Sequence, residues 1–359
     1  MSRPTIFNGL LDSRRLTLDS HMHFFLYEWC SGGGLVNEPG ALPVSLVREG
    51  VTMAGALAAD LKRIPRARVT ALRDPRVVQL APHGCEIIDV QSAAEHLDEF
   101  ERLTAMADAT LLIAPEFDGI LFKAARRAMQ CGGKLRSPSP EFIKIAADKH
   151  ATCERLAAAG VPVPAGLLLE PEQKLPTDFS YPGVLKPVDG TGSQDTLLVA
   201  GPHDDPPPYA WPRRLEKYLT GQAASVAFLC GPAGRVPLVP CKQRISEDGR
   251  LKYRGGELPL SGGLAERAIA LGERALAALP ATAGYVGVDL VLGSDPAGGE
   301  DAVIEINPRL TTSYVGLRAA AKTNLAEAVL RVAGGDTTPV EFLPRALEFD
   351  VDGNVSFLS

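Results

Sequence analysis

A short apolar segment near the end of the chain, residues 302–309, alternates apolar and polar side chains. It has the sequence Ala-Val-Ile-Glu-Ile-Asn-Pro-Arg, and the proline predicts that a buried strand stops there. Because successive side chains of a strand point to opposite faces, Glu305 and Asn307 should project from one side while Ile304 and Ile306 pack on the other. A carboxylate and an amide oxygen side by side on a rigid element suit a hard cation such as Mg²⁺.

A second apolar segment, residues 285–292, contains a single acid, Asp289. Burying a carboxylate in a strand is costly unless it is paired or bound to a metal. We therefore predict that Asp289, Glu305 and Asn307 form one Mg²⁺ site for nucleotide phosphates, with Mn²⁺ as an alternative metal.

The composition bounds the classes of protein to which the chain can belong. With 359 residues it is long enough for two or three domains. Its 45% hydrophobic and 22% charged residues are typical of soluble globular proteins. The net charge of -6 argues against nucleic acid as the main partner, and no apolar run is long enough to span a membrane. The six cysteines are scattered without a CxxC pair, which argues against zinc and favours a reduced, cytoplasmic setting.

The first part of the chain predicts a parallel sheet. Residues 1–21 are polar and irregular, and we interpret them as a leader or a tag. Residues 22–137 alternate strand patterns, at 24–27, 68–72, 86–90 and 110–113, with helical patterns such as 44–62. This βαβ alternation predicts a doubly wound parallel sheet. The loop from Ser31 to Gly34 follows the first strand, where α/β folds often bind ligands, but it is not spaced as GxGxxG, so a substrate loop and a plain turn are both open.

Two prolines within residues 137–140 mark the next border, because proline interrupts regular hydrogen bonding. Beyond it we expect one helix from about 140 to 160, a strand at 184–187, a helix at 264–279 and a last long helix at 316–333. We place domain borders after residues 137, 220 and 335, which leaves 336–359 as a C-terminal tail.

Several further residues are candidates for anion binding. Lys186 lies inside an apolar strand, where a lysine needs a partner. A glycine-rich loop follows it directly and contains Asp189, Gly190, Thr191, Gly192 and Ser193. The backbone N–H groups of such a loop can hold phosphates, although the loop is not a P-loop and a hairpin turn is the commoner meaning of an isolated GTG. Its position next to Lys186 favours phosphate binding.

Two other elements are weak alone. Lys149 lies on a predicted helix, where a solvated face is the ordinary interpretation. The segment Glu216, Lys217, Tyr218 and Leu219 can present backbone groups to a purine edge, but a surface linker is the preferred interpretation of this element by itself.

The order of these elements is more specific than any of them. A lysine on a helix, a lysine on a strand, a glycine loop, a Glu-x-Tyr segment and then Asp…Glu-x-Asn resembles the ATP-grasp superfamily of carboxylate–amine ligases, over residues 138–333. The resemblance implies a fold of mixed α/β and α+β class: a leading α/β domain, a small lid-bearing domain at 138–220, and a larger domain with an antiparallel sheet at 221–335, with ATP held between the last two.

The resemblance also implies roles for the candidate residues. Lys149 and Lys186 would hold the α- and β-phosphates under a lid formed by residues 189–195. Glu216 would take the adenine amino group, and the backbone at Lys217 and at Tyr218 or Leu219 would complete the hinge. Asp289, Glu305 and Asn307 would bind the metal. The catalytic residues would be Lys186, Arg309 and Arg244, and Arg309 would face the transferred phosphate or an acceptor carboxylate. Lys242 and Arg244 are further candidates for the anionic centre, but a pair on the surface is an equally good interpretation of both.

Two departures and one narrower match refine this prediction. Ala223 stands where many members have a ribose-binding acid, and Gly287 stands where peptidoglycan dipeptide ligases have an arginine. The segment Tyr-Glu-Trp-Cys-Ser-Gly-Gly-Gly at 27–34 is similar to the opening of the archaeal tyramine–glutamate ligases of methanofuran synthesis, which would place the loop near the acceptor substrate.

The activity that this resemblance implies is ATP-dependent amide formation. A small-molecule carboxylate, such as glutamate or another amino acid, would form an acylphosphate and then react with an amine, giving ADP and phosphate in a one-carbon cofactor pathway of methanofuran or pterin type. A non-catalytic nucleotide sensor and a bicarbonate-dependent carboxylase are the alternatives, and an NAD-dependent dehydrogenase is a weaker one. The partners would be small molecules and, in a homo-oligomer, further copies of the chain.

Overall fold

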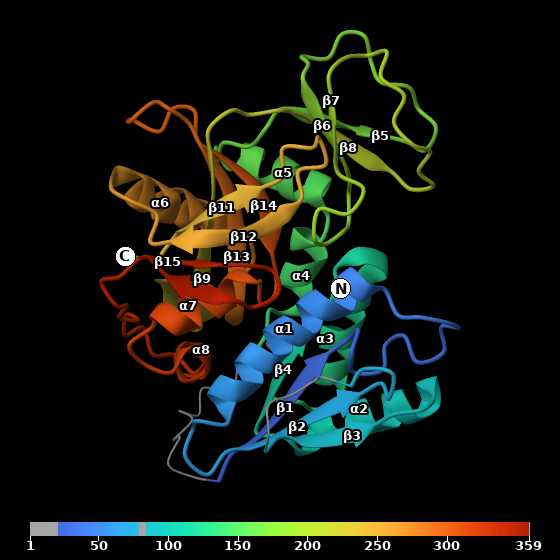
Figure 1. Ribbon diagram of the computed structural model, residues 1–359, viewed down its shortest axis with the longest axis vertical. Helices are drawn as coiled ribbons and strands as arrows, with labels where there is room; N and C mark the ends of the chain where they lie inside the picture. Colours follow the sequence, from blue (N-terminus) through green and yellow to red (C-terminus); the bar gives the residue numbers. More distant parts are fainter. Residues whose placement is uncertain (1–20, 79–83, 359) are drawn as a thin grey trace, which may run out of the picture.

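The computed structural model describes residues 21–78 and 84–358 (Figure 1). The segment 1–21, which we interpreted as a leader or tag, lies outside these residues except for its last position. The described chain forms a parallel sheet, a small antiparallel sheet and a large antiparallel sheet, and Figure 1 places the first two at opposite ends of the molecule.

The N-terminal part is the doubly wound sheet that the sequence predicts. Its strands lie in the order β3-β2-β1-β4 and pair in parallel. Phe24 and Leu26 pack with α1 on one face, while Phe25 and Tyr27 pack with α2 and α3 on the other. The elements are β1 (His23–Glu28), α1 (Val44–Leu61), β2 (Arg68–Arg73), β3 (Glu86–Asp89), α2 (Ala93–Met106), β4 (Ala109–Ile113), the 3₁₀ turn η1 (Phe117–Gly119) and α3 (Ile120–Gln130).

The carboxyl ends of β1 and β4 are neighbours in this sheet, although distant in sequence. After β1 the chain forms β2 and β3 on one side of β1 in the sheet, and then, through α2, it forms β4 on the other side of β1. Such a topological switch point opens a crevice that α/β proteins use for ligands. It faces the two antiparallel sheets through α1 and the loop after β4.

The small sheet has the order β5-β8-β6-β7 and is preceded by two helices. The single helix expected from 140 to 160 is wrong, because the chain breaks at residues 147–148. There Asp148 caps a second helix, its Oδ1 accepting from the N–H of Ala151 at 2.9 Å. The elements are α4 (Pro140–Ala146), α5 (Lys149–Ala158), β5 (Gly166–Leu169), β6 (Gly183–Pro187), β7 (Leu197–Val199) and β8 (Arg213–Lys217).

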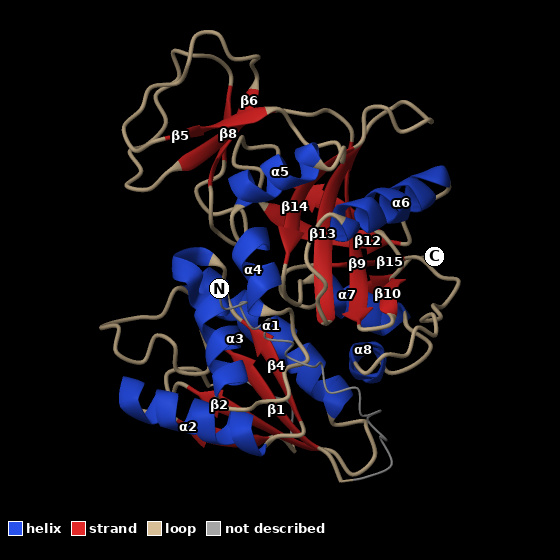
Figure 2. Ribbon diagram, turned by 180° about the vertical axis from the view of Figure 1, so that it is seen from behind, coloured by secondary structure: helices blue, strands red, loops and turns tan. Residues whose placement is uncertain are grey.

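The large sheet has the order β14-β13-β9-β11-β12-β15-β16, with β10 beside β9. Alternate residues of β9 face opposite sides: Val226 and Phe228 pack with α6, and Ala227 and Leu229 pack with α7 and α8. The three helices are labelled beside the sheet in Figure 2. Its strands are β9 (Gln222–Gly231), β10 (Gly234–Pro237), β11 (Cys241–Ile245), β12 (Tyr253–Leu258), β13 (Gly284–Leu292), β14 (Ala302–Asn307), β15 (Leu347–Phe349) and β16 (Val355–Phe357), and its helices are α6 (Gly263–Ala277), α7 (Ser313–Ala320) and α8 (Leu325–Ala333).

Two expectations for the C-terminal part need correction. The long helix at 316–333 is two helices, because Asn324 begins α8 as a cap whose Oδ1 accepts from the N–H groups of Ala326 and Glu327. Residues 347–357, expected within a tail, form β15 and β16 and extend the large sheet. A strand pair of three residues each carries little sequence signal, since its stability comes from the sheet edge on which it forms.

Helix α1 joins the parallel sheet to the large domain. Asp60, only 1% exposed, accepts hydrogen bonds from the Tyr314 hydroxyl at 2.8 Å and from the Arg318 guanidinium at 2.7 and 3.0 Å. A buried carboxylate that is paired and fully hydrogen-bonded fixes a single relative placement of its elements. The amino-terminal half of α1 is thereby held over the site described next. No helix in the described residues combines the length and apolar character needed to cross a membrane.

Candidate active site

A cavity of about 700 Å³ lies where the N-terminal part, the small sheet and the large sheet meet. Its walls come from α1, α5, β6, the glycine loop, the end of β8 and the strands β9, β11, β13 and β14. Most of the predicted site residues line it: Lys149, Lys186, Gly190, Thr191, Gly192, Ser193, Glu216, Lys217, Tyr218, Leu219, Asp289, Glu305, Asn307 and Arg309.

The three predicted metal ligands are brought together by the pairing of β13 with β14. In that antiparallel register Asp289 lies opposite Glu305, and Gly287 lies opposite Asn307. The Asn307 amide donates to Asp289 Oδ2 at 2.9 Å, and the Gln243 amide donates to Asp289 Oδ1 at 2.8 Å. Both carboxylates and the amide thus face one point of the cavity wall.

The electrostatics of this pair favour a cation. Burial, followed by the nearby charge of Glu305, raises the pKa of Asp289 from 3.8 to about 7. The described residues contain no metal-like group of three His, Cys, Asp or Glu side chains. Two carboxylates and an amide on adjacent strands fit Mg²⁺ instead, because this ion takes few protein ligands and completes its shell with water and substrate phosphates.

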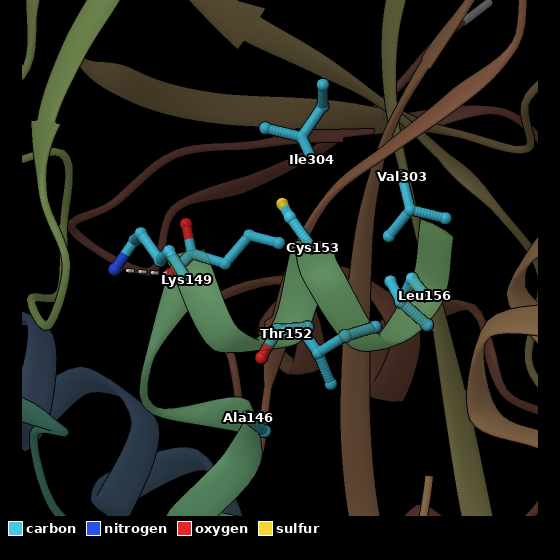
Figure 3. A pocket seen from close by; sticks show the side chains of 9 residues that line it. Ala146, Lys149, Thr152, Cys153, Leu156, Val303 and Ile304 are labelled. Carbon is cyan, nitrogen blue, oxygen red and sulfur yellow. Dashed lines mark ion pairs between the residues drawn. The ribbon is translucent and has the colours of Figure 1, made fainter. Parts of the chain in front are cut away.

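Lys149 is not on a solvated helix face. It is the first residue of α5, is 8% exposed, and its Nζ lies 3.1 Å from Glu305 Oε1 and 2.9 Å from the Gly190 carbonyl oxygen. Figure 3 shows its side chain pointing away from the apolar contact that Leu156 makes with Val303 of β14. Because α5 packs on β14, the Lys149 ammonium lies within contact distance of both Glu305 on β14 and the glycine loop.

Lys186 and Glu216 form a buried pair. Lys186 Nζ lies 2.6 Å from Glu216 Oε1, and Arg214 Nε donates to Glu216 Oε2 at 2.8 Å. Burial lowers the pKa of Lys186, but the charges of Glu216 and Glu305 outweigh it, so the pKa is raised and the ammonium form is retained. The sequence did not single out Arg214, because a second cation on a short strand is usually a surface residue.

The segment predicted as a linker begins as strand. Glu216 and Lys217 belong to β8, and only Tyr218 and Leu219 follow it. The N–H of Lys217 donates to the Ala165 carbonyl at 2.8 Å, and that of Tyr218 to the Pro182 carbonyl at 3.0 Å. These two N–H groups already donate to carbonyls of the protein. A nucleotide base bound beside residues 216–219 would therefore have to use other backbone groups of this segment.

Arg309 joins the domains at the other end of the cavity. It is 8% exposed, and its Nε lies 2.9 Å from Oε1 of Glu116, a fully buried carboxylate on the loop after β4. Its other nitrogens donate to the Leu310 carbonyl and to the hydroxyl of Thr191 on the glycine loop. Both oxygens of Glu116 fall outside good hydrogen-bond geometry, so the contact with Arg309 is an ion pair. Glu116 was not identified from the sequence, since a lone acid after a strand is common.

Arg244 does not belong to this group. Its guanidinium donates to Glu348 Oε2 at 2.7 Å and to the Phe349 carbonyl at 2.9 Å, towards β15, and Lys242 lies 3.4 Å from Glu257. The neighbouring Gln243 and Ile245 line the cavity instead. Of the two interpretations given above for Lys242 and Arg244, the surface pair agrees with these contacts, because neighbouring residues of a strand face opposite sides.

The loop from Ser31 to Gly34 lies against its own domain. Ser31 is fully buried, and both its N–H and its hydroxyl donate to the Glu28 carboxylate, so these residues do not line the cavity. Of the two interpretations left open above, the plain turn agrees with this packing.

Comparison with known proteins agrees with this geometry. An ATP-grasp domain model matches residues 146–313, and a pre ATP-grasp 3 domain model matches residues 67–143. A tyramine–L-glutamate ligase of Methanocaldococcus jannaschii is 25% identical over 272 residues, which cover 74% of this chain and 76% of the relative. The ligase of the same name from Methanocaldococcus fervens is 27% identical over 230 residues, covering 64% and 67%.

Solved structures show the same fold. An ATP-grasp superfamily protein from Archaeoglobus fulgidus superposes with a TM-score of 0.67 at 23% identity, over 92% of both chains. An L-amino acid ligase from Bacillus licheniformis gives 0.66 at 15% identity, over 91% of this chain and 79% of that one. An N5-carboxyaminoimidazole synthetase from Staphylococcus aureus, solved with ADP, gives 0.68 at 14% identity, over 92% and 82%.

Proposed function

The chain belongs to the ATP-grasp family and is a ligase of that family, and we propose that it joins the carboxylate of glutamate to a primary amine, giving ADP and phosphate. The observation that carries the proposal is the convergence of Lys149, Lys186, Arg309 and the two metal-type carboxylates on one cavity between the sheets. The glutamate and the amine are proposed from the relatives named tyramine–L-glutamate ligases.

We propose that the phosphates of ATP lie along the line from Lys186 to Arg309. Lys149 and Lys186 are buried cations on two different elements, and each lies near Glu305, so they flank the metal-type cluster. Asp289, Glu305 and Asn307 would hold Mg²⁺, which would neutralise part of the negative charge of the triphosphate. The lysines and Arg309 would hold the transferred phosphoryl group in place for attack by the substrate carboxylate.

The glycine loop is proposed as the cover of the reacting groups. Thr191 already contacts Arg309, and the carbonyl of Gly190 holds Lys149, so the loop is fastened to both ends of the phosphate path. A cover of this kind excludes water, which would otherwise hydrolyse the acylphosphate. The product amide would therefore form inside a closed cavity, without an acyl-enzyme.

The test is direct product analysis. The enzyme is incubated with ATP, Mg²⁺, glutamate and a pool of primary amines that includes tyramine, and nucleotides and amides are identified by mass spectrometry. ADP together with a glutamyl amide supports the proposal. AMP as the nucleotide product, or ADP formation that depends on bicarbonate and gives no amide, contradicts it.

A further inference from the structure

One carboxylate in the cavity has no part in the chemistry described so far. Glu49 lies in the second turn of α1 and lines the same cavity as Arg309, Thr191 and Gly192. Its Oε2 lies 3.4 Å from the position that a Cβ on Gly192 would take, so it faces the glycine loop directly. Glu49 is thus a residue of α1, in the N-terminal part, that lines a cavity formed mainly by the other two parts of the chain.

Within residues 21–78 and 84–358 the Glu49 carboxylate has neither a hydrogen bond nor an ion pair. Its neighbour Arg48 turns away to Asp352, with Nε 2.9 Å from Oδ1. Arg309 is near enough for its charge to act on Glu49, but its nitrogens are already taken by Glu116, Thr191 and the Leu310 carbonyl. A half-buried carboxylate left without a partner is a site for a cation that the protein itself does not supply.

The surroundings strengthen this inference. Burial raises the pKa of Glu49, although the charges of Arg309 and Arg48 oppose the rise. A carboxyl group with a raised pKa is a better proton acceptor than an ordinary surface glutamate. Since Arg309 follows the strand that carries Glu305, a group bound to Glu49 lies in the same cavity as the place proposed for the acylphosphate.

We propose that Glu49 binds the ammonium group of the amine substrate and removes a proton from it before attack. This inference rests on the proposed ligase function. One proton passes from the ammonium nitrogen to the Glu49 carboxylate. The freed lone pair then forms the C–N bond to the acyl carbon, the C–O bond to phosphate breaks with its electron pair, and the second nitrogen proton leaves with the phosphate as hydrogen phosphate. The substrate class is therefore a primary amine that is cationic in water.

The test compares two nucleophiles on one acylphosphate. With ATP, Mg²⁺ and glutamate, tyramine reports amide formation, and hydroxylamine reports acylphosphate formation as glutamyl hydroxamate. Hydroxylamine is neutral near pH 7 and needs neither an anionic partner nor a base. We expect Glu49→Gln to lower kcat/KM for tyramine by about 100-fold or more while hydroxamate formation stays within a few-fold of wild type.

Three further measurements make the result decisive. Glu49→Asp keeps the carboxylate and should recover part of the tyramine reaction. Glu38→Gln, the same change at an exposed position, is the matched control and should leave both reactions unchanged. Thermal unfolding and binding of an ATP analogue check that Glu49→Gln is folded and still holds nucleotide.

The other outcomes overturn the inference in distinguishable ways. If Glu49→Gln forms amide at the wild-type rate, Glu49 has no role in amine binding. If hydroxamate and amide fall together while the KM for glutamate rises, the carboxylate holds the α-ammonium group of the acid substrate instead. If the wild-type enzyme forms neither product from glutamate, the proposed function fails, and the role of Glu49 fails with it.

Discussion

Replacing Asp289 by asparagine should make the metal-free protein more stable at alkaline pH while it abolishes ligase activity. The folded protein holds the proton of Asp289 more tightly than the unfolded chain does, since its pKa rises from 3.8 to about 7. The stability that this proton contributes is complete below about pH 4 and is lost as the pH rises through about 7, where the folded protein must ionise beside Glu305.

The magnitude follows from the size of the shift. A rise of roughly three units corresponds to about 4 kcal/mol of unfolding free energy at 1.36 kcal/mol per unit. The cavity admits some solvent to Asp289, which screens its charge, so we expect about half of this, roughly 2 kcal/mol. The substitution also disturbs the hydrogen bonds from Gln243 and Asn307, at a cost of about 1 kcal/mol that does not depend on pH.

The assay is urea unfolding in the presence of a chelator, from about pH 3.5, below the unfolded pKa, to about pH 8.5, of the wild type and Asp289→Asn. The quantity of interest is the difference between the two proteins, because all other titrating groups cancel from it. The variant should gain about 2 kcal/mol relative to the wild type as the pH rises. Asp205→Asn, an exposed change of the same kind, should show no such gain. Parallel pH profiles for wild type and Asp289→Asn would refute the reasoning.

Three further substitutions test other parts of the structure. Lys186→Ala should lower kcat/KM by at least about 30-fold, or about 2 kcal/mol of transition-state stabilisation, measured as ADP release; an unchanged rate would remove Lys186 from the phosphate site. Arg244→Ala should leave ADP release within a few-fold of wild type, because its guanidinium is bound to Glu348 outside the cavity; a loss as large as that of Lys186→Ala would reinstate it in the site. Asp60→Asn should cost about 3 kcal/mol of unfolding free energy, because it leaves the Arg318 charge without its buried partner, and a urea midpoint equal to that of wild type would show that this contact does not hold α1 in place.

The metal-type strands could be predicted from the sequence because their signal is local. Residues 285–292 and 302–307 are mostly apolar, and each segment contains one acid, Asp289 or Glu305. Because the residues next to each acid face the core, the alternation of side chains along a strand places the acid on the other face. The doubly wound N-terminal sheet was predictable for the same reason, since its strands and helices differ in period. The glycine loop and the two lysines gained meaning only from their order along the chain.

Only the tertiary structure showed what surrounds four charged residues: Arg244, Glu49, Glu116 and Arg214. Arg244 and Gln243 are adjacent in sequence, and only the pairing of β11 with β9 and β12 decides which of them faces the cavity. Glu116 and Glu49 come from segments about 190 and 260 residues before Arg309. Glu116 pairs with Arg309, and Glu49 lines the same cavity, because α1 and the loop after β4 meet the large domain at the switch point.

Short-range periodicity thus determined most of the elements of this chain and the polar residues that they present, but not the breaks between α4 and α5 and between α7 and α8, nor the edge strands β15 and β16. The partners of those residues were decided by packing between distant elements, because burial leaves each charge only the neighbours that the fold brings to it.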